Sequence, residues 1–341
     1  MFSLSDIDER SRDGLMDLRA LSPEDQGAVL RHLEHEARAR NVIDGHVYML
    51  SSRARHVLDR MGEIEFGMHD LDGTHTSIGG HRLHTESLDG LDRTRLSGMR
   101  NVALTGRHEW QVRELMQNHP FAKPFEQYLI EQGFYRINGK GQLELFEGSP
   151  AIEHLVTQVR NHFDPLLGEI GNRHGVAFET TSLRGEGDVA YPAAHQTMYS
   201  IDAMEGGRKI ADQAKHERIF AELAGRWAER DPENSIATLR TSSTGTFEFT
   251  PDGVNKEGAA RSLLNEQGVR ERDAAYFGDS SNDLPVFQGM PDLGGKFAIV
   301  NPHTKDELIG NADLATVGIN AGPILRRLAM AREAAKKIVV P

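Results

Sequence analysis

Two acidic turns, each following a short apolar segment, constrain this sequence more than any other feature. Asp70–Thr74 (DLDGT) follows the segment 64–68, and Gly278–Asp283 (GDSSND) follows Tyr276-Phe277. The pattern is typical of a buried strand that ends in a turn with two carboxylates, which are ligands that Mg²⁺ prefers. Because Asp, Asn and Ser are also common turn residues, either turn alone would be a weak indication. Two such turns, about two hundred residues apart, predict one metal site that the fold assembles.

The composition narrows the class of protein. A chain of 341 residues with 38% hydrophobic residues predicts two domains. The formal net charge of −12 argues against a nucleic-acid partner, because phosphate backbones require a basic surface. The absence of cysteine excludes disulfides, thiol catalysis and cysteine-based zinc sites. No apolar run approaches the roughly 18 residues that a bilayer span needs, and Met1–Asp6 lacks the basic and apolar regions that are expected of a secretory signal. We therefore expect a cytoplasmic protein with no membrane partner.

Short apolar segments alternate with amphipathic ones around both turns. Four strands are expected, near residues 64–68, 101–104, 274–277 and 297–300. Strands that alternate with helices predict an α/β fold with a doubly wound, Rossmann-like parallel sheet. In such sheets ligands bind at the carboxyl ends of the strands. Both acidic turns, Thr105 and Asn301 fall at those ends.

The remaining segments predict a three-part organisation. Residues 1–60 are expected to form a helical extension that could mediate self-association, with helical spacing of apolar residues in 13–20 and 23–39. The catalytic core is expected to comprise residues 61–116 and 245–341. Residues 117–244 are expected to form an inserted α+β cap domain with mostly antiparallel hairpins.

Two local expectations bear on the site. The segment 79–98, rich in Gly, His, Asp and Arg, suits a loop or flap. Glu65–His69, the segment before the first turn, is more polar than a buried central strand usually is.

In order along the chain, Asp70–Thr74, Leu104–Gly106, Lys256 and Gly278–Asp283 resemble the four motifs of the haloacid dehalogenase (HAD) phosphohydrolases. The resemblance covers about a third of the chain and places the predicted cap where that family carries a large α/β cap. Thr-Gly-Arg ending at Arg107 and Gly-Val-Asn-Lys ending at Lys256 are similar to cap-bearing sugar phosphatases, including trehalose-phosphate phosphatases. The last motif is more similar to sucrose-phosphate and mannosylglycerate-phosphate phosphatases.

The resemblance implies roles that agree with the chemistry of each residue. Asp70 would be the nucleophile that forms an aspartyl phosphate, and Mg²⁺ and Lys256 would lower its pKa so that it stays ionised. Asp72 would act as general acid and then as general base. The implied Mg²⁺ ligands are Asp70, Asp72, Asp279 and Asp283, with Asn282 able to orient the last of them.

Phosphate binding is implied for a second group of residues. The backbone around Leu71 and Asp72 would turn its N–H groups towards the phosphoryl oxygens. Thr105 would donate its hydroxyl and Gly106 its N–H, and the Lys256 ammonium would neutralise developing charge.

The candidates for substrate contact are polar residues outside these motifs: Arg107, Arg184 and His195, followed by Tyr191 and Lys209. Histidines also cluster after the first turn, at His69, His75, His81 and His84, and histidine is a common metal ligand. Their spacing matches no helical H-x-x-x-H pattern. The sequence therefore favours loop histidines over a zinc site.

The leading functional hypothesis is a Mg²⁺-dependent phosphatase for a phosphorylated sugar or sugar derivative. A phosphosugar mutase or other phosphotransferase on the same fold is the alternative within enzymes. A non-catalytic binding protein with this fold is the alternative from another class. Intact Asp70, Asp72, Thr105, Lys256 and Asp279 favour the enzymes.

Overall fold

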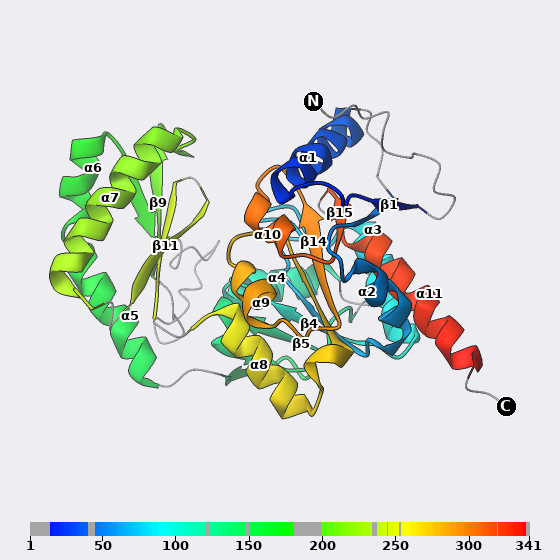
Figure 1. Cartoon of the computed structure of the whole chain (residues 1–341). Helices are drawn as coiled ribbons and strands as arrows, with labels where there is room; N and C mark the ends of the chain where they lie inside the picture. The colour runs from blue at the N-terminus through cyan, green and yellow to red at the C-terminus, as the bar shows by residue number, and fades with distance from the viewer. Residues whose placement is uncertain are drawn as a thin grey trace. The chain divides into compact units, whose positions relative to one another are not determined.

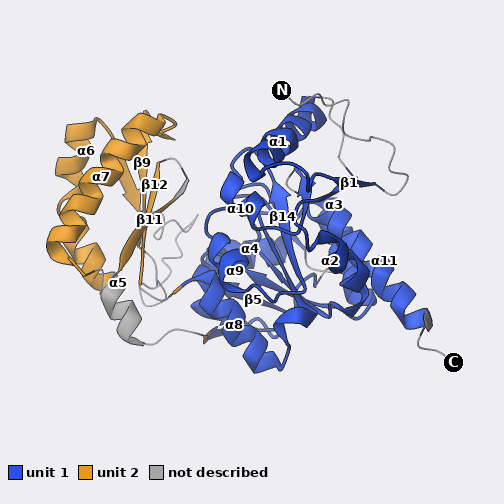
Figure 2. Cartoon of the chain, in the orientation of Figure 1, with its two compact units in different colours: residues 1–144, 255–341 blue, residues 145–254 orange. Residues whose placement is uncertain are grey.

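The chain forms two compact units in a computed structural model (Figure 2). The large unit contains residues 1–144 and 255–341, and the small unit contains residues 145–254. The structure describes residues 14–39, 45–119, 123–146, 150–180, 199–233, 237–243, 245–251, 254–318 and 320–338. None of the helices in these ranges combines the length and apolar character that a bilayer crossing requires.

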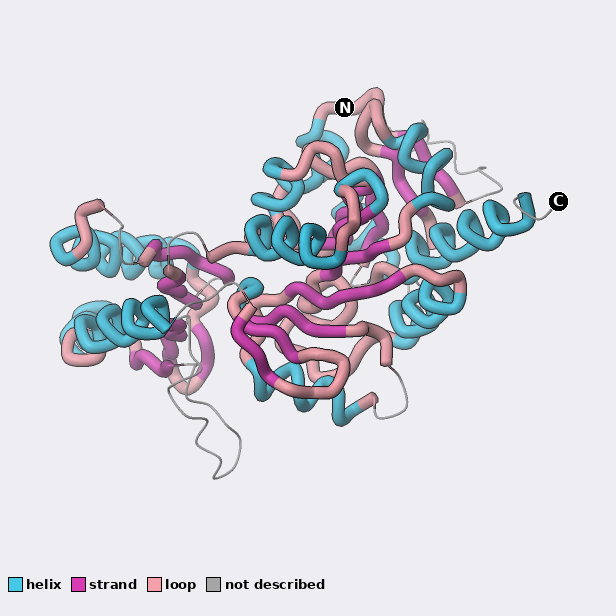
Figure 3. The backbone as a smooth tube through the Cα atoms, turned by 90° about the horizontal axis from the view of Figure 1, so that it is seen from below, coloured by secondary structure: helices cyan, strands magenta, loops and turns pink. Residues whose placement is uncertain are grey.

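One ten-stranded sheet organises the large unit (Figures 1 and 3). In spatial order its strands are β1 (Leu15–Asp17), β2 (Val47–Met49), β15 (Leu314–Val317), β14 (Gly295–Val300), β13 (Ala274–Gly278), β3 (Phe66–His69), β4 (Arg100–Leu104), β5 (Gln127–Ile130), β6 (Tyr135–Ile137) and β7 (Leu143–Leu145). The strands from β15 to β5 pair in parallel. The pairings β15–β2 and β5–β6 are antiparallel.

Helices pack against the sheet and shield the central strands. They are α1 (Pro23–Ala39), α2 (Ala54–Arg60), α3 (Thr85–Leu96), α4 (Glu109–Asn118), α8 (Lys256–Gln267), α9 (Leu284–Gly289), α10 (Asp306–Gly310) and α11 (Gly322–Ile338). In Figure 1, α8, α9 and α10 lie on one side of the sheet and α3 and α11 on the other. Every residue of β3, β13 and β15 is buried, as expected for parallel strands covered on both faces. The doubly wound α/β core predicted from the sequence is thus confirmed.

The small unit is an α+β layer built on an antiparallel sheet. Its strands are β8 (Ala177–Thr180), β9 (Tyr199–Glu205), β10 (Arg208–Lys209), β11 (Thr238–Ser243) and β12 (Thr246–Thr250), and its helices are α5 (Pro150–Phe163), α6 (Leu167–His174) and α7 (Gln213–Arg230). Alternate residues of β9 and β12 face the helices, as the period of two in a strand requires. Tyr199, Ile201 and Phe249 share one buried cluster with Phe163 and Trp227 from the helices.

Three segments differ from the sequence-based expectation. Residues 15–17, expected to be helical, form strand β1, which pairs in parallel with β2. Both strands extend the large sheet, so this region is not solely a helical extension. The hairpin β6–β7, which we assigned to the cap, also belongs to that sheet. The predicted flap 79–98 contains helix α3, whose buried Ser87, Gly90, Leu91 and Thr94 form a stripe at helical spacing. Small and polar residues on that stripe concealed it in the sequence.

Candidate active site

A buried lysine joins the two acidic turns. The Lys256 ammonium is 2.7 Å from Asp70 Oδ1 and 2.7 Å from Asp283 Oδ1. Its side chain has no exposed surface, because Lys256 is the first residue of α8 and points into the site from the helix start. Asp70 follows β3 and Asp283 follows β13, two adjacent parallel strands. The predicted meeting of the two turns at the carboxyl edge of the sheet is therefore observed.

Asp283 is a positioning carboxylate. Its Oδ1 accepts hydrogen bonds from Lys256 and from the Tyr276 hydroxyl at 2.7 Å. Its Oδ2 accepts from the backbone N–H groups of Asp279 and Ser280, both at 3.0 Å. Because both of its oxygens accept hydrogen bonds, Asp283 orients Lys256 and shapes the turn. Towards a cation it offers negative charge, and neither oxygen is free of hydrogen bonds.

Asp279 is oriented from the neighbouring strand ends. Asn301, which follows β14, donates from Nδ2 to Asp279 Oδ2 at 2.6 Å and to the Gly73 carbonyl at 3.4 Å. Gly73 has φ +69°, and a β-carbon there would collide with the Asp279 carboxylate. Glycine thus allows the first turn to pass close to the second. Sequence analysis placed Asn301 at a strand end but gave it no role. An amide in that position was the available signal.

The charges of this cluster fit a divalent cation. Asp70, Asp279 and Asp283 each offer a carboxylate oxygen, and these atoms lie within 4.8 Å of one another. Three carboxylates against one ammonium leave a formal charge of −2 in a buried site, and buried charge requires compensation. Burial and the neighbouring Asp70 and Asp283 charges raise the pKa of Asp279 well above its usual value. Mg²⁺ bound by Asp70 and Asp279, with Asp283 behind them, would supply the missing positive charge.

Burial and the neighbouring Asp283 and Asp72 charges together outweigh the attraction of Lys256 and raise the pKa of Asp70 to about 7. For Lys256, burial acts to lower the pKa, but the Asp283 and Asp70 carboxylates raise it above its usual value. Lys256 alone therefore does not produce the lowered pKa that was expected from Lys256 and Mg²⁺ together. A bound Mg²⁺ would lower the pKa of Asp70 from this value.

Three backbone N–H groups beside Asp70 are arranged for an anion. Those of Leu71, Asp72 and Gly106 have no hydrogen-bond acceptor within the described part of the chain. The Leu71 carbonyl accepts instead from later residues of the turn, so the chain curls with its early N–H groups outward. Thr105 Oγ1 accepts from the Arg107 N–H at 3.2 Å, which leaves its hydroxyl hydrogen available to donate. These are the predicted phosphate-binding positions, and their role stays a prediction.

Arg107 contacts the proposed acid–base residue. Its Nε donates to Asp72 Oδ2 at 2.8 Å and its Nη2 to Asp72 Oδ1 at 2.6 Å. Nη2 also donates to Thr76 Oγ1 and the Gly80 carbonyl, each at 2.8 Å. The Arg107 side chain is 3% exposed, whereas that of Asp72 is 32% exposed. Arg107 is thus a buried clamp for Asp72, and the substrate contact expected from the sequence stays a prediction. Asp72 is not part of the carboxylate group formed by Asp70, Asp279 and Asp283.

A buried polar chain supports the strand that leads to Asp70. His69 Nε2 lies 3.0 Å from Asn101 Oδ1, and His69 Nδ1 lies 3.1 Å from His75 Nε2. Asn101 Nδ2 donates to Thr94 Oγ1, so its oxygen must face His69 and accept a hydrogen from it. His69 Nδ1 then accepts from His75. The strand is polar in sequence yet buried because its polar atoms have partners, and His69 also stacks on Phe277.

The other predicted contacts lie outside the described residues or in the small unit. Arg184, His195 and Tyr191 lie outside the described residues. Lys209 is in the small unit, 3.1 Å from Asp202 and hydrogen-bonded to Thr246. Among the described residues the histidines form no group with metal-ligand spacing.

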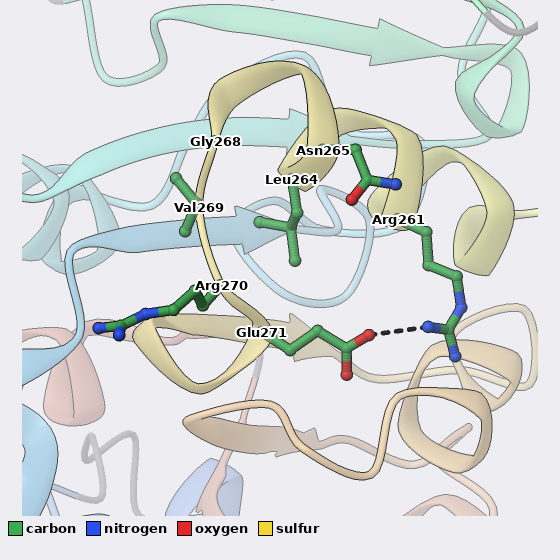
Figure 4. A pocket seen from close by; sticks show the side chains of 7 residues that line it. All are labelled: Arg261, Leu264, Asn265, Gly268, Val269, Arg270 and Glu271. Carbon is green, nitrogen blue, oxygen red and sulfur yellow. Dashed lines mark hydrogen bonds and ion pairs between the residues drawn. The ribbon is translucent and has the colours of Figure 1, made fainter.

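A separate cavity of about 380 Å³ lies beyond the last turn of α8, away from Lys256 (Figure 4). An ion pair between Arg261 and Glu271 crosses it at 2.7 Å, and Arg270 points away. Arg261 also pairs with Glu257 and Arg270 with Asp273, so the cavity presents no unpaired guanidinium. We do not assign it to the reaction.

Comparison with known proteins agrees with this geometry. A family model described as haloacid dehalogenase-like hydrolase matches residues 196–316, which include Lys256 and the second acidic turn. No functionally curated protein matches the sequence.

Solved structures resemble most of this chain in fold. One from Thermotoga maritima has a TM-score of 0.55 at 17% identity and covers 78% of this chain and 97% of its own. A haloacid dehalogenase-like hydrolase from Bacteroides thetaiotaomicron has a TM-score of 0.52 at 18% identity, with 80% and 99% covered. A second protein of that organism, described among phosphatases of this superfamily, has a TM-score of 0.52 at 15% identity, with 79% and 96% covered. The chain therefore has the haloacid dehalogenase-like hydrolase fold, and residues 196–316 carry the matching sequence pattern.

Mg²⁺ affinity should rise with pH through about 7, because the cation must displace the proton that Asp70 holds below that value. The raised pKa of Asp70 also implies that the free energy of unfolding of the metal-free protein falls as the pH rises from 3.8 to about 7. In this range the unfolded chain has released the proton, whereas the folded chain still holds it. Mg²⁺ titrations followed by thermal unfolding at pH 5.5 and pH 8 test this. Equal stabilisation at both pH values would refute the assignment of Asp70 as a ligand.

Asn301→Ala should weaken Mg²⁺ binding roughly 10- to 100-fold, because Asp279 loses the amide that orients it. Isothermal titration calorimetry measures the change. Asn311→Ala, which alters an exposed amide bonded to a backbone carbonyl, is the matched control and should bind Mg²⁺ as the native protein does. Unchanged affinity in Asn301→Ala would show that Asp279 needs no such support.

Proposed function

We propose that this protein is a Mg²⁺-dependent phosphatase that hydrolyses a phosphorylated sugar or sugar derivative through an aspartyl phosphate. The observation that carries the proposal is the buried Asp70–Lys256–Asp283 arrangement beside three unpaired N–H groups. It offers a nucleophile, a fixed positive charge and anion-binding donors at one strand edge. Hydrolysis of a phosphate ester through a covalent intermediate uses all three.

In the first half-reaction Asp70 attacks phosphorus. Lys256 is bound to Oδ1, and Oδ2 has no hydrogen-bond partner among the described residues, so Oδ2 is the attacking atom. A bond forms between Oδ2 and phosphorus as the bond from phosphorus to the leaving oxygen breaks. Asp72 gives that oxygen a proton, and the alcohol departs. The N–H groups of Leu71 and Gly106 receive the phosphoryl oxygens.

In the second half-reaction water replaces Asp70 on phosphorus. Asp72, now a carboxylate held by Arg107, accepts a proton from the water as its oxygen bonds to phosphorus. The acyl phosphate bond breaks, inorganic phosphate is released and Asp70 returns as a carboxylate. Mg²⁺ held by Asp70 and Asp279 would add positive charge beside the phosphoryl oxygens in both halves. The positive charge that the protein itself contributes next to Asp70 is the Lys256 ammonium.

The sugar component rests on sequence. Thr105-Gly106-Arg107 and Gly253–Lys256 are similar to the corresponding motifs of cap-bearing sugar phosphatases. That the protein is cytoplasmic and that its substrate is a phosphorylated sugar are both parts of this proposal.

Asp70→Asn should abolish turnover, by at least about a thousandfold, because an amide cannot form the aspartyl phosphate. Because aspartate and asparagine have nearly the same size, the protein should stay folded. Hydrolysis of p-nitrophenyl phosphate and circular dichroism measure the two properties. Asp89→Asn, at an exposed carboxylate paired with Arg93, is the control and should retain full activity.

Undiminished hydrolysis by Asp70→Asn would remove Asp70 as the nucleophile. Activity of the native protein should also vanish with EDTA and return with Mg²⁺. If the native protein with Mg²⁺ hydrolyses none of a broad panel of sugar phosphates and no p-nitrophenyl phosphate, the phosphatase proposal fails.

Arg107→Met should lower kcat for sugar phosphates roughly 10²-fold, because Asp72 loses its clamp and acid–base catalysis is worth about 10²–10⁴-fold. p-Nitrophenyl phosphate, whose leaving group needs little protonation, should be affected less in the first half-reaction. Steady-state kinetics on both substrates separates the effects.

Arg113→Met removes a guanidinium that pairs with Glu109 within helix α4 and is the matched control. A rise in KM with unchanged kcat in Arg107→Met would favour the substrate contact predicted from the sequence over the clamp.

A further inference from the structure

A strained turn lies next to the candidate active site. In the described part of the chain, two non-glycine residues have positive φ, Glu131 at 51° and Gln132 at 63°, and Gly133 follows at 95°. Residues other than glycine, asparagine and aspartate rarely adopt this left-handed region, which costs of order 1–3 kcal/mol each. The turn comes directly after β5, at the same edge of the sheet as Asp70. Such strain persists only where the surroundings enforce it.

The loop after β4 enforces it from one side. The Glu131 N–H donates to the Arg107 carbonyl at 3.0 Å, and the Gln132 N–H donates to the Thr105 carbonyl at 2.9 Å. The Glu131 carboxylate is buried and lies 3.1 Å from His108 Nδ1. Three contacts therefore lock the turn to the residues that flank Gly106.

Helix α8 enforces it from the other side. A β-carbon on Gly133 would collide with the side chain of Ala259, which lies one turn after Lys256. Only glycine allows this approach at φ 95°. The turn Glu131–Gly133 is thus wedged between the loop of Thr105 and Gly106 and the helix that carries Lys256.

The result is the placement of one side-chain amide. Gln132 Nε2 lies 2.7 Å from the position that a β-carbon on Gly106 would occupy. Gln132 is 8% exposed, and within the described residues its side-chain amide has no hydrogen-bond partner. The Gly106 N–H beside it is also without an acceptor there. Two polar groups at the ends of the adjacent strands β4 and β5 therefore lie close together.

We propose that Gln132 is a further substrate-contacting residue, whose side-chain amide donates a hydrogen bond to an oxygen of the phosphate group received by Gly106. This inference rests on the proposed function, because it assumes a phosphate at Gly106. Glycine at position 132 would adopt the same backbone without strain. The glutamine is therefore held in an unfavourable conformation at the point where its amide meets the site.

Gln132→Gly separates the amide from the backbone, because it removes the donor and relieves the strain together. Its melting temperature should equal or exceed that of the native protein. Its affinity for inorganic phosphate in the presence of Mg²⁺, measured by calorimetry, should fall about tenfold, which corresponds to about 1.4 kcal/mol. kcat/KM for p-nitrophenyl phosphate should fall by a similar factor or more.

Gln132→Asn keeps an amide on a residue that tolerates positive φ, so it should recover part of the phosphate affinity. Gln213→Ala, at an exposed glutamine that starts α7, is the control and should bind phosphate as the native protein does. Native phosphate affinity in Gln132→Gly would overturn the inference. A lower melting temperature with loss of binding that asparagine does not restore would also overturn it and leave a purely structural turn.

The outcomes for the two proposals can be told apart. If the native protein hydrolyses no ester but binds inorganic phosphate more tightly than Gln132→Gly does, the phosphatase proposal fails and the Gln132 contact stands. If the native protein is an active phosphatase and Gln132→Gly equals it in kcat/KM and phosphate affinity, only the Gln132 contact fails.

Discussion

The contact of one buried ammonium with two carboxylates is the interaction on which the site depends. Lys256 joins Asp70 and Asp283, and through them it ties α8 to the ends of β3 and β13. Replacing Lys256 would leave buried carboxylates without their counter-charge, which costs several kcal/mol. The same lysine that would stabilise charge in the reaction therefore also holds three elements together. Its contribution to stability cannot be varied independently of its contribution to function.

Sequence reasoning found the parts of this arrangement that depend on local pattern. Each acidic turn follows an apolar segment, and parallel strands have their carboxyl ends at one edge of the sheet. The closeness of Asp70 and Asp279 could therefore be predicted from the sequence. Contacts that depend on a distant partner could not be predicted. The sequence singled out Arg107, but its hydrogen bonds to Asp72 became apparent only in the structure. Helix α3 was hidden because its buried stripe contains Ser, Gly and Thr in place of large apolar residues.

The direction of the Asp70 pKa illustrates the same limit. A neighbouring lysine predicts a lowered value, but burial and nearby carboxylates together outweigh it. Desolvation depends on the depth of a group, which no local pattern specifies. The site consequently has a deficit of positive charge that its own residues do not remedy. The Mg²⁺ that the sequence argument invoked together with Lys256 would supply that charge.

The hydrogen-bonded imidazoles of His69 and His75 affect the stability of the fold at acidic pH. Burial lowers the pKa of His69 to about 3 and that of His75 well below its usual value, so both rings stay neutral inside the protein. In the unfolded chain they take up protons as the pH falls below 6.5, and this uptake favours unfolding. His69 ends the central strand β3, and His75 lies in the turn that follows Asp70. Acidification below pH 6.5 therefore destabilises the fold through two rings that flank the nucleophile along the chain.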